Sequence, residues 1–327
     1  MRAIQAVRAG GSDVLKLIDL PDPAPSAGEV LVRSAAAGIN FIDTYRRGGV
    51  YPMPFPHIPG DEGAGVVTAV GDGVTDLVVG DKVAWADAPG SYAELVRVKA
   101  ERALRVPEDV ALDVAAALPL QGLTAHYLVA STYPVQPGDW ILVHAGAGGV
   151  GLLLTQLATA RGARVITTVS TQDKEALSRA AGAAEVIRYD LLKDLTAELP
   201  GLVREIAGGG VTVVYDGVGR STFDASLASL RRRGLMVLFG ASSGPVPPFD
   251  IQRLNSGGSL FLTRPTLGHH IATSEELRWR ADELFAAVLD GTLDVRIGNR
   301  FPLAEARAAH DALEGRATTG KVILEMS

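Results

Sequence analysis

The sequence predicts an α/β fold in which a β-rich unit comes first and a doubly wound parallel sheet fills the second half of the chain. Residues 1–120 carry short apolar runs separated by Gly, Pro and Asp, which is typical of strands joined by turns. From Trp140 onward, wholly apolar runs alternate with amphipathic ones, as in a parallel sheet covered by helices on both faces. A chain of 327 residues is longer than one hydrophobic core usually accommodates, which indicates two domains.

The first unit is expected to consist mainly of β-strands. Each of its apolar runs has the length of a strand and ends at turn-forming residues. In chain order, these runs are residues 14–20, 29–37, 63–71, 80–86 and 91–98.

The second unit is expected to alternate strand and helix. Its predicted strands are residues 140–145, 163–170, 184–189, 211–216, 235–240 and 259–263, and its predicted helices are 151–161, 173–182 and 221–232. After Pro265, residues 274–291 have a helical pattern that begins with a Ser-x-x-Glu-like capping box at Ser274 and ends on Gly291. Residues 321–326 form a last strand-like run.

Charge and hydropathy narrow the possible partners. The formal net charge is −6, from 31 Lys and Arg against 37 Asp and Glu, so no basic field favours nucleic acid. Although 47% of the residues are hydrophobic, no apolar stretch reaches the roughly 18 residues that a membrane span needs. We therefore expect neither a nucleic-acid nor a membrane partner.

Cysteine is absent from the sequence. This excludes disulfides, thiolate nucleophiles and Cys-ligated zinc. The N-terminal segment MRAIQAVRAGG lacks the apolar core of an export signal, so we expect a cytoplasmic protein.

Residues 144–158, HAGAGGVGLLLTQLA, place three glycines between a predicted strand and a predicted helix. This context favours a dinucleotide-binding turn over an ordinary Gly-rich turn. Gly146 allows the tight turn, Gly148 lets the backbone approach a pyrophosphate, and Gly151 permits close packing of the helix on the strand. The N-terminus of the helix offers N–H donors and a positive dipole to the phosphates.

The end of the next strand indicates which dinucleotide is bound. In NAD-specific folds an acidic residue there binds the ribose hydroxyls, whereas this chain has Ser170 and Thr171, followed by Lys174. Two hydroxyls and a cation suit a 2′-phosphate better, which predicts NADPH. NAD remains the alternative, because Asp173 is an acidic residue close to the end of this strand.

The chain resembles the medium-chain dehydrogenase/reductase superfamily and, within it, the quinone oxidoreductase (zeta-crystallin-like) family. The resemblance rests on segments that occur in the family's order along nearly the whole chain: 35–52, 59–74, 80–85, 120–128, 144–151, 214–219, 239–244, 262–267 and 319–324. It implies a GroES-like β-rich catalytic domain of residues 1–121 and 265–327, and a Rossmann cofactor-binding domain of residues 122–264. It also implies NADPH as the hydride donor.

Site residues follow from the resemblance position by position. Asn40, Tyr45 and Tyr51 are the implied catalytic residues, with Asn40 and Tyr45 also on the nicotinamide side. The other implied cofactor-binding residues are Thr124, Gly146, Ala147, Gly148, Gly149, Val150, Ser170, Thr171, Lys174, Tyr189, Val218, Phe239, Gly240, Ala241, Ser242, Phe261, Leu262 and Thr263.

The sequence does not support a zinc site or the Tyr-x-x-x-Lys catalytic pair. Zinc-dependent relatives carry Gly-His-Glu where this chain reads Gly60-Asp61-Glu62, so the ligand set is incomplete and no metal is expected. His57 is expected in a loop, and His269 and His270 at the surface. The Tyr-x-x-x-Lys match at 189–193 follows a strand rather than lying on a helix, and we interpret it as accidental.

The predicted activity is zinc-independent transfer of reducing equivalents from NADPH to a quinone. The acceptor is expected between the two domains, where Tyr51 or Asn40 donates a hydrogen bond to the developing oxyanion. The alternatives are reduction of another activated alkene, such as an enone, and an NADPH-binding structural or regulatory protein. Because the apolar strand 259–263 would be an exposed edge, a homodimer is also expected.

Overall fold

The computed structural model describes residues 1–326 and divides the chain into two compact units. The first unit contains Met1–Leu123 and the chain from Ala272 onward, and the second is Thr124–Ile271. These divisions lie a few residues after the expected ones, at 121 and 264. No helix within residues 1–326 is both long and apolar enough to cross a membrane.

The second unit is built on a parallel sheet with the order β10-β9-β8-β11-β12-β13. Its strands are β8 (Trp140–Val143), β9 (Arg164–Val169), β10 (Glu185–Arg188), β11 (Val211–Asp216), β12 (Leu230–Leu238) and β13 (Phe261–Thr263). Because β8 pairs with β9 on one side and β11 on the other, the order reverses at β8, as in a doubly wound sheet. The predicted fold class is thereby confirmed.

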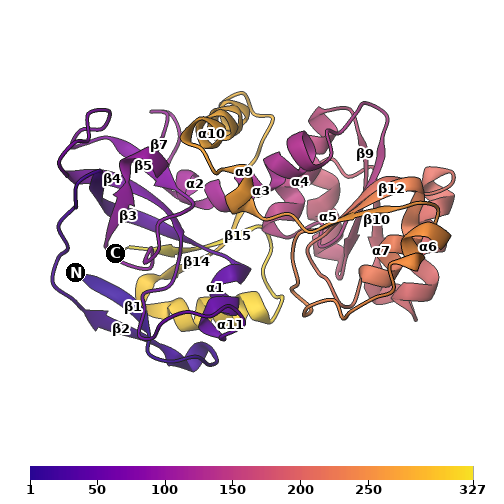
Figure 1. The fold of residues 1–327 in the computed structure, drawn as a ribbon, viewed down its shortest axis with the longest axis horizontal. Helices are drawn as coiled ribbons and strands as arrows, with labels where there is room; N and C mark the ends of the chain where they lie inside the picture. The colour runs from indigo at the N-terminus through magenta and orange to yellow at the C-terminus, as the bar shows by residue number, and fades with distance from the viewer. Residues whose placement is uncertain (327) are drawn as a thin grey trace. The chain divides into compact units, whose positions relative to one another are not determined.

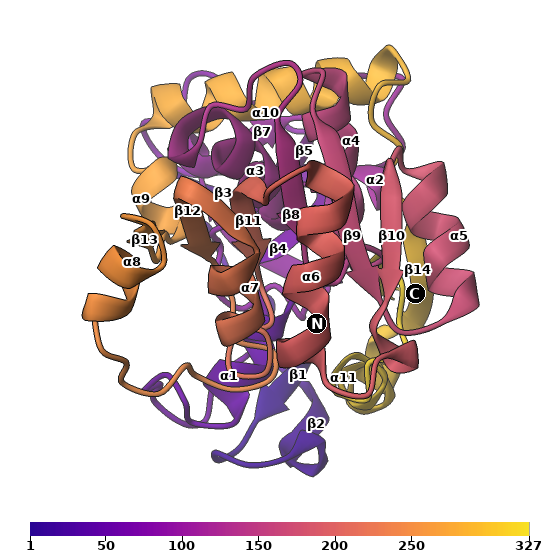
Figure 2. The ribbon, with the colours of Figure 1, turned by 90° about the vertical axis from the view of Figure 1, so that its right-hand side faces the viewer.

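Helices cover both faces of this sheet. They are α4 (Gly149–Ala160), α5 (Gln172–Ala180), α6 (Leu195–Ala207) and α7 (Phe223–Ser229), with the short helices α8 (Gln252–Ser256) and α9 (Leu267–His270) near β13 in the sequence. In Figures 1 and 2, α6 and α7 lie together on one face and α4 lies on the other. Buried aliphatic residues of β8, β9, β11 and α6 form the core beneath α6 and α7, so this face of the sheet is apolar, as the sequence predicts.

The helix predicted for residues 221–232 is too long. α7 ends at Ser229, and Leu230 already pairs with Val211 as the first residue of β12. The register then shifts before Leu235 pairs with Val213, and Arg233 in this bulge has a φ of 60°. An irregular, polar strand segment has no clear period of two, so its sequence continued the helical pattern.

The first unit contains a mixed sheet with the order β14-β15-β3-β4-β5-β7, and β6 also pairs with β3. Its strands are β3 (Glu29–Ile39), β4 (Glu62–Val70), β5 (Lys82–Trp85), β6 (Leu95–Lys99), β7 (Leu104–Arg105), β14 (Ile297–Pro302) and β15 (Lys321–Glu325), and β1 (Arg2–Ala6) forms a separate hairpin with β2 (Leu15–Asp19). The last strand, β15, runs antiparallel to β3. Both ends of the chain therefore belong to this unit (Figure 1).

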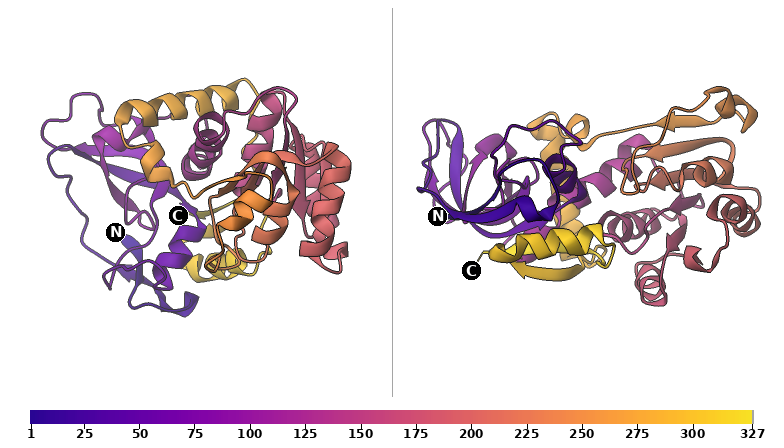
Figure 3. Two further views of the ribbon diagram at one scale, coloured as in Figure 1. Left: turned by 45° about the vertical axis from the view of Figure 1, so that its right-hand side comes forward. Right: turned by 90° about the horizontal axis from the view of Figure 1, so that it is seen from below.

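The first unit also carries α1 (Phe41–Arg47), α2 (Leu112–Ala117), α10 (Ser274–Leu289), α11 (Ala306–Glu314) and the start of α3 (Pro119–Tyr127). In Figure 3, α11 is the yellow helix beside the yellow strand β14. The predicted capping box of α10 is displaced by one residue. Thr273 rather than Ser274 is the N-cap, because its hydroxyl accepts a hydrogen bond from the Glu276 amide.

Candidate functional site

Most of the cofactor residues predicted in the second unit lie in the segments that follow the strands of its parallel sheet, whereas Thr124 lies in α3. Because the strands are parallel, the segments that follow them leave from the same edge. In sheet order, these segments carry Tyr189 after β10, Ser170 and Thr171 after β9, Gly146 to Val150 after β8, Val218 after β11 and Phe239 to Ser242 after β12, while Phe261 to Thr263 form β13 itself.

The glycine turn after β8 is shaped by close packing. Its left-handed residue is Ala145, with a φ of 54°, and not Gly146, from which we expected the tight turn. A Cβ on Gly146 would lie 2.5 Å from Cβ of Thr167 and 2.7 Å from Oγ of Ser178. A Cβ on Gly151 would overlap the Ala145 carbonyl oxygen. Gly146 and Gly151 therefore let the turn fit between β9 and α4.

Gly148 leaves the start of α4 open to a phosphate. It is the N-cap, in an extended conformation with φ −78° and ψ 170°, and it provides no side-chain cap. The first turn of α4, within residues 149–152, has no acidic side chain. The unfilled N–H groups at this helix end fit an anionic ligand, so the turn fits a dinucleotide pyrophosphate.

Asp216, which no sequence pattern indicated, holds the loop after β11. Its Oδ1 accepts hydrogen bonds from the amides of Val218 at 2.8 Å and Gly219 at 2.9 Å. Its Oδ2 accepts from the hydroxyls of Thr222 at 2.7 Å and Ser226 at 2.8 Å. A fully bonded carboxylate of this kind fixes the backbone beside Val218.

A hydrogen-bonded chain connects this loop with the glycine turn. Nε2 of His144 lies 2.9 Å from Oγ of Ser226, which bonds Asp216, and Nδ1 of His144 lies 2.9 Å from Oγ1 of Thr168. Ser226 is fully buried between its two partners, so this hydrogen-bonded network orders the carboxyl end of the parallel sheet and is not a nucleophilic triad. Sequence spacing did not indicate it, because its members come from separate elements: His144 follows β8, Thr168 lies in β9, Asp216 ends β11 and Ser226 lies in α7.

The segment after β9 matches its predicted role in part. Lys174 Nζ donates to Oγ of Ser170 at 3.4 Å, and the Thr171 hydroxyl caps α5 by accepting from the Lys174 amide at 3.3 Å. Tyr189 begins a 3₁₀ turn, Tyr189–Leu191, so the Tyr-x-x-x-Lys match does not lie on an α-helix. A cation and two hydroxyls are thus close together at the start of α5.

In the first unit, Asn40, Tyr45 and Tyr51 belong to one short segment around α1. Asn40 is the buried N-cap of α1. The rings of Tyr45 and Tyr51 are 6.2 Å apart and inclined by 56°, and the turn between them contains Gly49 with a φ of 79°. The structure therefore brings the two phenols together, with Tyr51 43% exposed.

The side chain of Asn40 lies in a buried polar cluster. Its Nδ2 donates to Oε2 of Glu62 at 2.7 Å, and its Oδ1 accepts from Nζ of Lys321 at 2.8 Å and Nε2 of Gln121 at 3.3 Å. Lys321 also forms a short ion pair with Glu62. Burial lowers the pKa of Lys321, and the charge of Glu62 acts in the opposite direction.

A second buried network holds the backbone of α1. Asp43 Oδ2 accepts from the Asn40 amide and from the Tyr92 hydroxyl, both at 2.8 Å, and that hydroxyl lies 3.1 Å from Nε2 of His310. Nδ1 of His310 lies 2.9 Å from Nη1 of Arg47. Oδ1 of Asp43 has no hydrogen-bond partner among the described residues.

These surroundings shift two pKa values in opposite directions. Burial, reinforced by the nearby Asp61 charge, raises the pKa of Asp43 to about 7. Burial, reinforced by the Arg47 charge, lowers the pKa of His310 to about 3. Near neutral pH, His310 is therefore uncharged and Asp43 is close to its midpoint.

The residues at the position of a zinc site do not fit the metal. Asp61 is paired with Arg46, and Glu62 with Lys321. In residues 1–326, no group of at least three His, Cys, Asp or Glu side chains has the geometry of a metal site. The side chains at this position are therefore held by ion pairs and do not form a zinc-ligand set.

The histidines singled out in the sequence have local roles. His57 forms an isolated bridge with Ala6, and its Nδ1 lies 3.0 Å from the Pro54 carbonyl oxygen. His269 is exposed, as predicted. His270 is partly exposed, and its ring stacks on Tyr127 at 4.2 Å.

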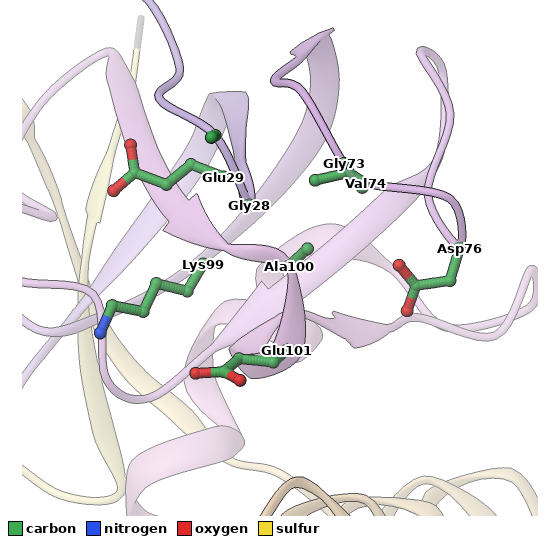
Figure 4. A pocket seen from close by; sticks show the side chains of 9 residues that line it. Gly28, Glu29, Gly73, Val74, Asp76, Lys99, Ala100 and Glu101 are labelled. Carbon is green, nitrogen blue, oxygen red and sulfur yellow. The ribbon is translucent and has the colours of Figure 1, made fainter.

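A separate hollow of about 420 Å³ lies in the first unit, beside the start of β3 and the end of β6. Figure 4 shows the charged ends of Glu29, Lys99, Glu101 and Asp76 spread around it rather than converging. Asp76 is also paired with Arg278. This hollow has no feature of a catalytic site.

Comparisons with known proteins support the GroES-like fold of the first unit and the dehydrogenase fold of the second. Residues 26–108 match the alcohol dehydrogenase GroES-like domain, and residues 149–286 match the zinc-binding dehydrogenase family. The chain is 44% identical to a quinone oxidoreductase of Pseudomonas aeruginosa, over 99% of each chain. It is 40% identical to a 2-haloacrylate reductase of a Burkholderia species, over 97% of this chain and 96% of that protein. A mycobacterial protein solved in complex with NADPH superposes with a TM-score of 0.97 at 53% identity, over 100% of each chain.

The pKa of Asp43 predicts how stability depends on pH. Between pH 3.8 and about 7, the unfolded chain releases the Asp43 proton while the folded chain keeps it. The contribution of Asp43 to the free energy of unfolding is therefore greatest below pH 3.8 and is lost as the pH rises through 7.

Asp43→Asn should remove this dependence. We expect the free energy of unfolding of the variant, relative to the unmodified protein, to increase by up to about 4 kcal/mol between pH 4 and pH 8. Urea unfolding at several pH values measures it. A difference that stays constant with pH would contradict the assignment.

Proposed function

The chain belongs to the medium-chain dehydrogenase/reductase superfamily and, within it, to the quinone oxidoreductase family, and from this premise we propose that it transfers reducing equivalents from NADPH to a quinone. The observation that carries the proposal is the match of 44% identity to a quinone oxidoreductase along 99% of the chain. The open glycine turn and the ordered sheet edge support NADPH as the cofactor.

NADPH supplies the hydride when it is bound, and the protein binds, orients and shields the reactants. Gly148 and the first amides of α4 bind the pyrophosphate, and Ser170, Thr171 and Lys174 bind the 2′-phosphate. Asp216 keeps the Val218 loop in place beside the nicotinamide. Tyr189 and residues 239–242, which follow other strands of the same sheet, act beside them.

The acceptor is bound by residues of the α1 segment. The paired rings of Tyr45 and Tyr51 offer flat faces and hydroxyl groups, which match the apolar face and carbonyl edge of a quinone. Tyr51 and Asn40 donate hydrogen bonds to the oxygen that gains negative charge. A quinone is electron-poor enough to accept a hydride without a metal.

The second candidate is reduction of another activated alkene, favoured by the similarity to the Burkholderia 2-haloacrylate reductase. Such an acceptor has the same conjugated carbonyl and would use the same donors. NADPH oxidation followed by absorbance, with a panel of quinones, enones and haloacrylates, distinguishes the two. Tight NADPH binding without turnover of any of them would instead favour a structural or regulatory role.

We further propose that the protein is a cytoplasmic homodimer. β13 is the last strand of the parallel sheet, and its Phe261 is 60% exposed. An apolar edge strand of this kind is commonly covered by a second copy through two-fold pairing.

The role of Tyr51 is tested by Tyr51→Phe. The variant should bind NADPH normally but lose about ten- to a hundredfold in kcat/KM for a quinone, because one donor to developing charge is lost. Tyr133→Phe, which removes a hydroxyl bonded to Asp139 elsewhere in the second unit, is the control. Equal kinetics in the two variants would remove Tyr51 from the site.

Cofactor preference is tested by Lys174→Glu. Losing a charge-assisted contact should weaken NADPH binding by about ten- to a hundredfold and leave NADH binding nearly unchanged. Lys193→Glu makes the same change of charge at an exposed position in the same unit. Fluorescence titration of both cofactors measures the effect, and an unmodified protein that binds NADH and NADPH equally would refute the 2′-phosphate site.

The dimer is tested by light scattering at micromolar concentration. We expect twice the mass of the 34.2 kDa chain, and the mass of a single chain for Phe261→Asp, because a buried charge at the strand edge opposes pairing. Leu191→Asp places the same charge at another exposed apolar residue of the unit and should remain dimeric. A single-chain mass for the unmodified protein would exclude the dimer.

A further inference from the structure

We infer that the buried ion pair of Glu62 and Lys321 is a positioning device: it fixes the side-chain amide of Asn40 so that one N–H is left to donate to the acceptor. The inference rests on the proposed function and deepens it. It assigns Asn40 the role of a donor only and names the two residues that impose this role.

The ion pair forms across the central strand of the sheet because that strand has a glycine between the partners. Gly38 of β3 lies opposite Glu62 of β4 on one side and Ile323 of β15 on the other. A Cβ on Gly38 would overlap the Glu62 carboxylate and lie 2.7 Å from Cε of Lys321. The two charged side chains therefore meet over Gly38.

The same register brings Asn40 to the pair. Ile39 lies opposite Val322, so continuing the antiparallel pairing by one residue sets Asn40 opposite Lys321. Alternate residues of a strand share one face, which puts Asn40 on the same face as Gly38. The hydrogen bonds from Asn40 to Glu62 and from Lys321 to Asn40 follow from this arrangement.

Both charges are deeply buried and well bonded. Glu62 has no exposed surface, and Lys321 is 1% exposed. Oε1 of Glu62 accepts from the Leu120 amide at 2.7 Å, at the beginning of α3, where the helix dipole favours a carboxylate. A buried pair whose members bond each other and their neighbours is a rigid reference for a nearby side chain.

The charges determine which way the Asn40 amide points. An ammonium group can only donate and a carboxylate can only accept. The observed orientation puts Oδ1 against Lys321 and Nδ2 against Glu62. The flipped amide would set its NH₂ against the ammonium and its oxygen against the carboxylate, so the ion pair excludes it.

One N–H group of the Asn40 side chain then remains to donate to the acceptor. Oδ1 of Asn40 uses both of its acceptor sites, for Lys321 and Gln121. Nδ2 carries two hydrogens, and Glu62 takes only one of them among the bonds of residues 1–326. Because the Asn40 amide and carbonyl groups of the backbone are bonded to Asp43, the remaining N–H is held in one direction, suited to a developing oxyanion.

The test removes both charges together. In the double variant Glu62→Gln, Lys321→Met, no buried charge is left unpaired, so the chain should fold, but the amide of Asn40 is free to flip. We expect kcat for quinone to fall about ten- to a hundredfold, with NADPH affinity within about twofold. Lys321→Arg retains a cationic donor and should keep most of the activity.

Glu276→Gln is the matched control. It removes the carboxylate bonded to the fully buried Arg280 in the same unit, away from Asn40. It should leave kcat unchanged even if it lowers the melting temperature. A double variant with unchanged kcat, or a control with the same loss, would overturn the inference.

A readout independent of turnover separates this inference from the proposed function. With ¹⁵N-labelled asparagine, the Nδ2 proton of Asn40 that is bonded to Glu62 should exchange slowly with solvent in the unmodified protein and in Glu276→Gln, and faster in the double variant. Similar exchange in all three would refute the positioning role. Slow exchange lost only in the double variant, in a protein that reduces no quinone, would support the positioning role while rejecting the proposed function.

Discussion

The pairing of β3 with β15 is the constraint on which the first unit depends. β3 is long enough to pair with β6 along Glu29–Arg33 and with β15 along Ala36–Ile39, while β4 lies along its other side. The last strand of the chain thus completes a sheet begun near its start, and the second unit is an insertion between these parts. As a consequence, the residues around Asn40 come from positions about 20 and 280 apart in the sequence.

The second unit depends on a different constraint, the common direction of its strands. The six parallel strands have their carboxyl ends on the same side of the sheet. Glycines let the loops that follow these strands pack closely against one another. A Cβ on Gly217 would lie 2.9 Å from Cζ of Phe239, and a Cβ on Gly240 would lie 2.5 Å from the Gly217 carbonyl oxygen. Backbone contact and the bonds of Asp216 therefore fix these loops before any ligand binds, which is the preorganisation that a cofactor site needs.

The sequence was sufficient for the fold and for the parts of the site that are local. Strand–helix alternation predicted the parallel sheet, and the glycine spacing predicted the turn after β8. The sequence failed where structure depends on irregular or distant pairing. The bulge at Arg233 continued a helical pattern, and the left-handed residue of the turn after β8 is Ala145, which the glycine spacing did not indicate. The partners of Asn40 could not be predicted from the sequence, because strand register rather than sequence spacing brings them together. The one available sign was a lysine at the start of the apolar run 321–326.

The two buried networks of the first unit act on the same short segment. The Glu62–Lys321 pair holds the side chain of Asn40, and Asp43, bonded to Tyr92, holds its backbone. Because Asn40 begins α1 and Tyr45 lies just over one turn further on, a shift of either network would also move the phenol. Relatives with zinc can anchor an acceptor oxygen through the metal. Where the ligand set does not fit zinc, the anchor has to be a hydrogen bond, and a single donor is effective only if its direction is fixed. Buried charges are costly unless fully paired, so their presence beside Asn40 is best explained by the orientation they impose rather than by the stability they add.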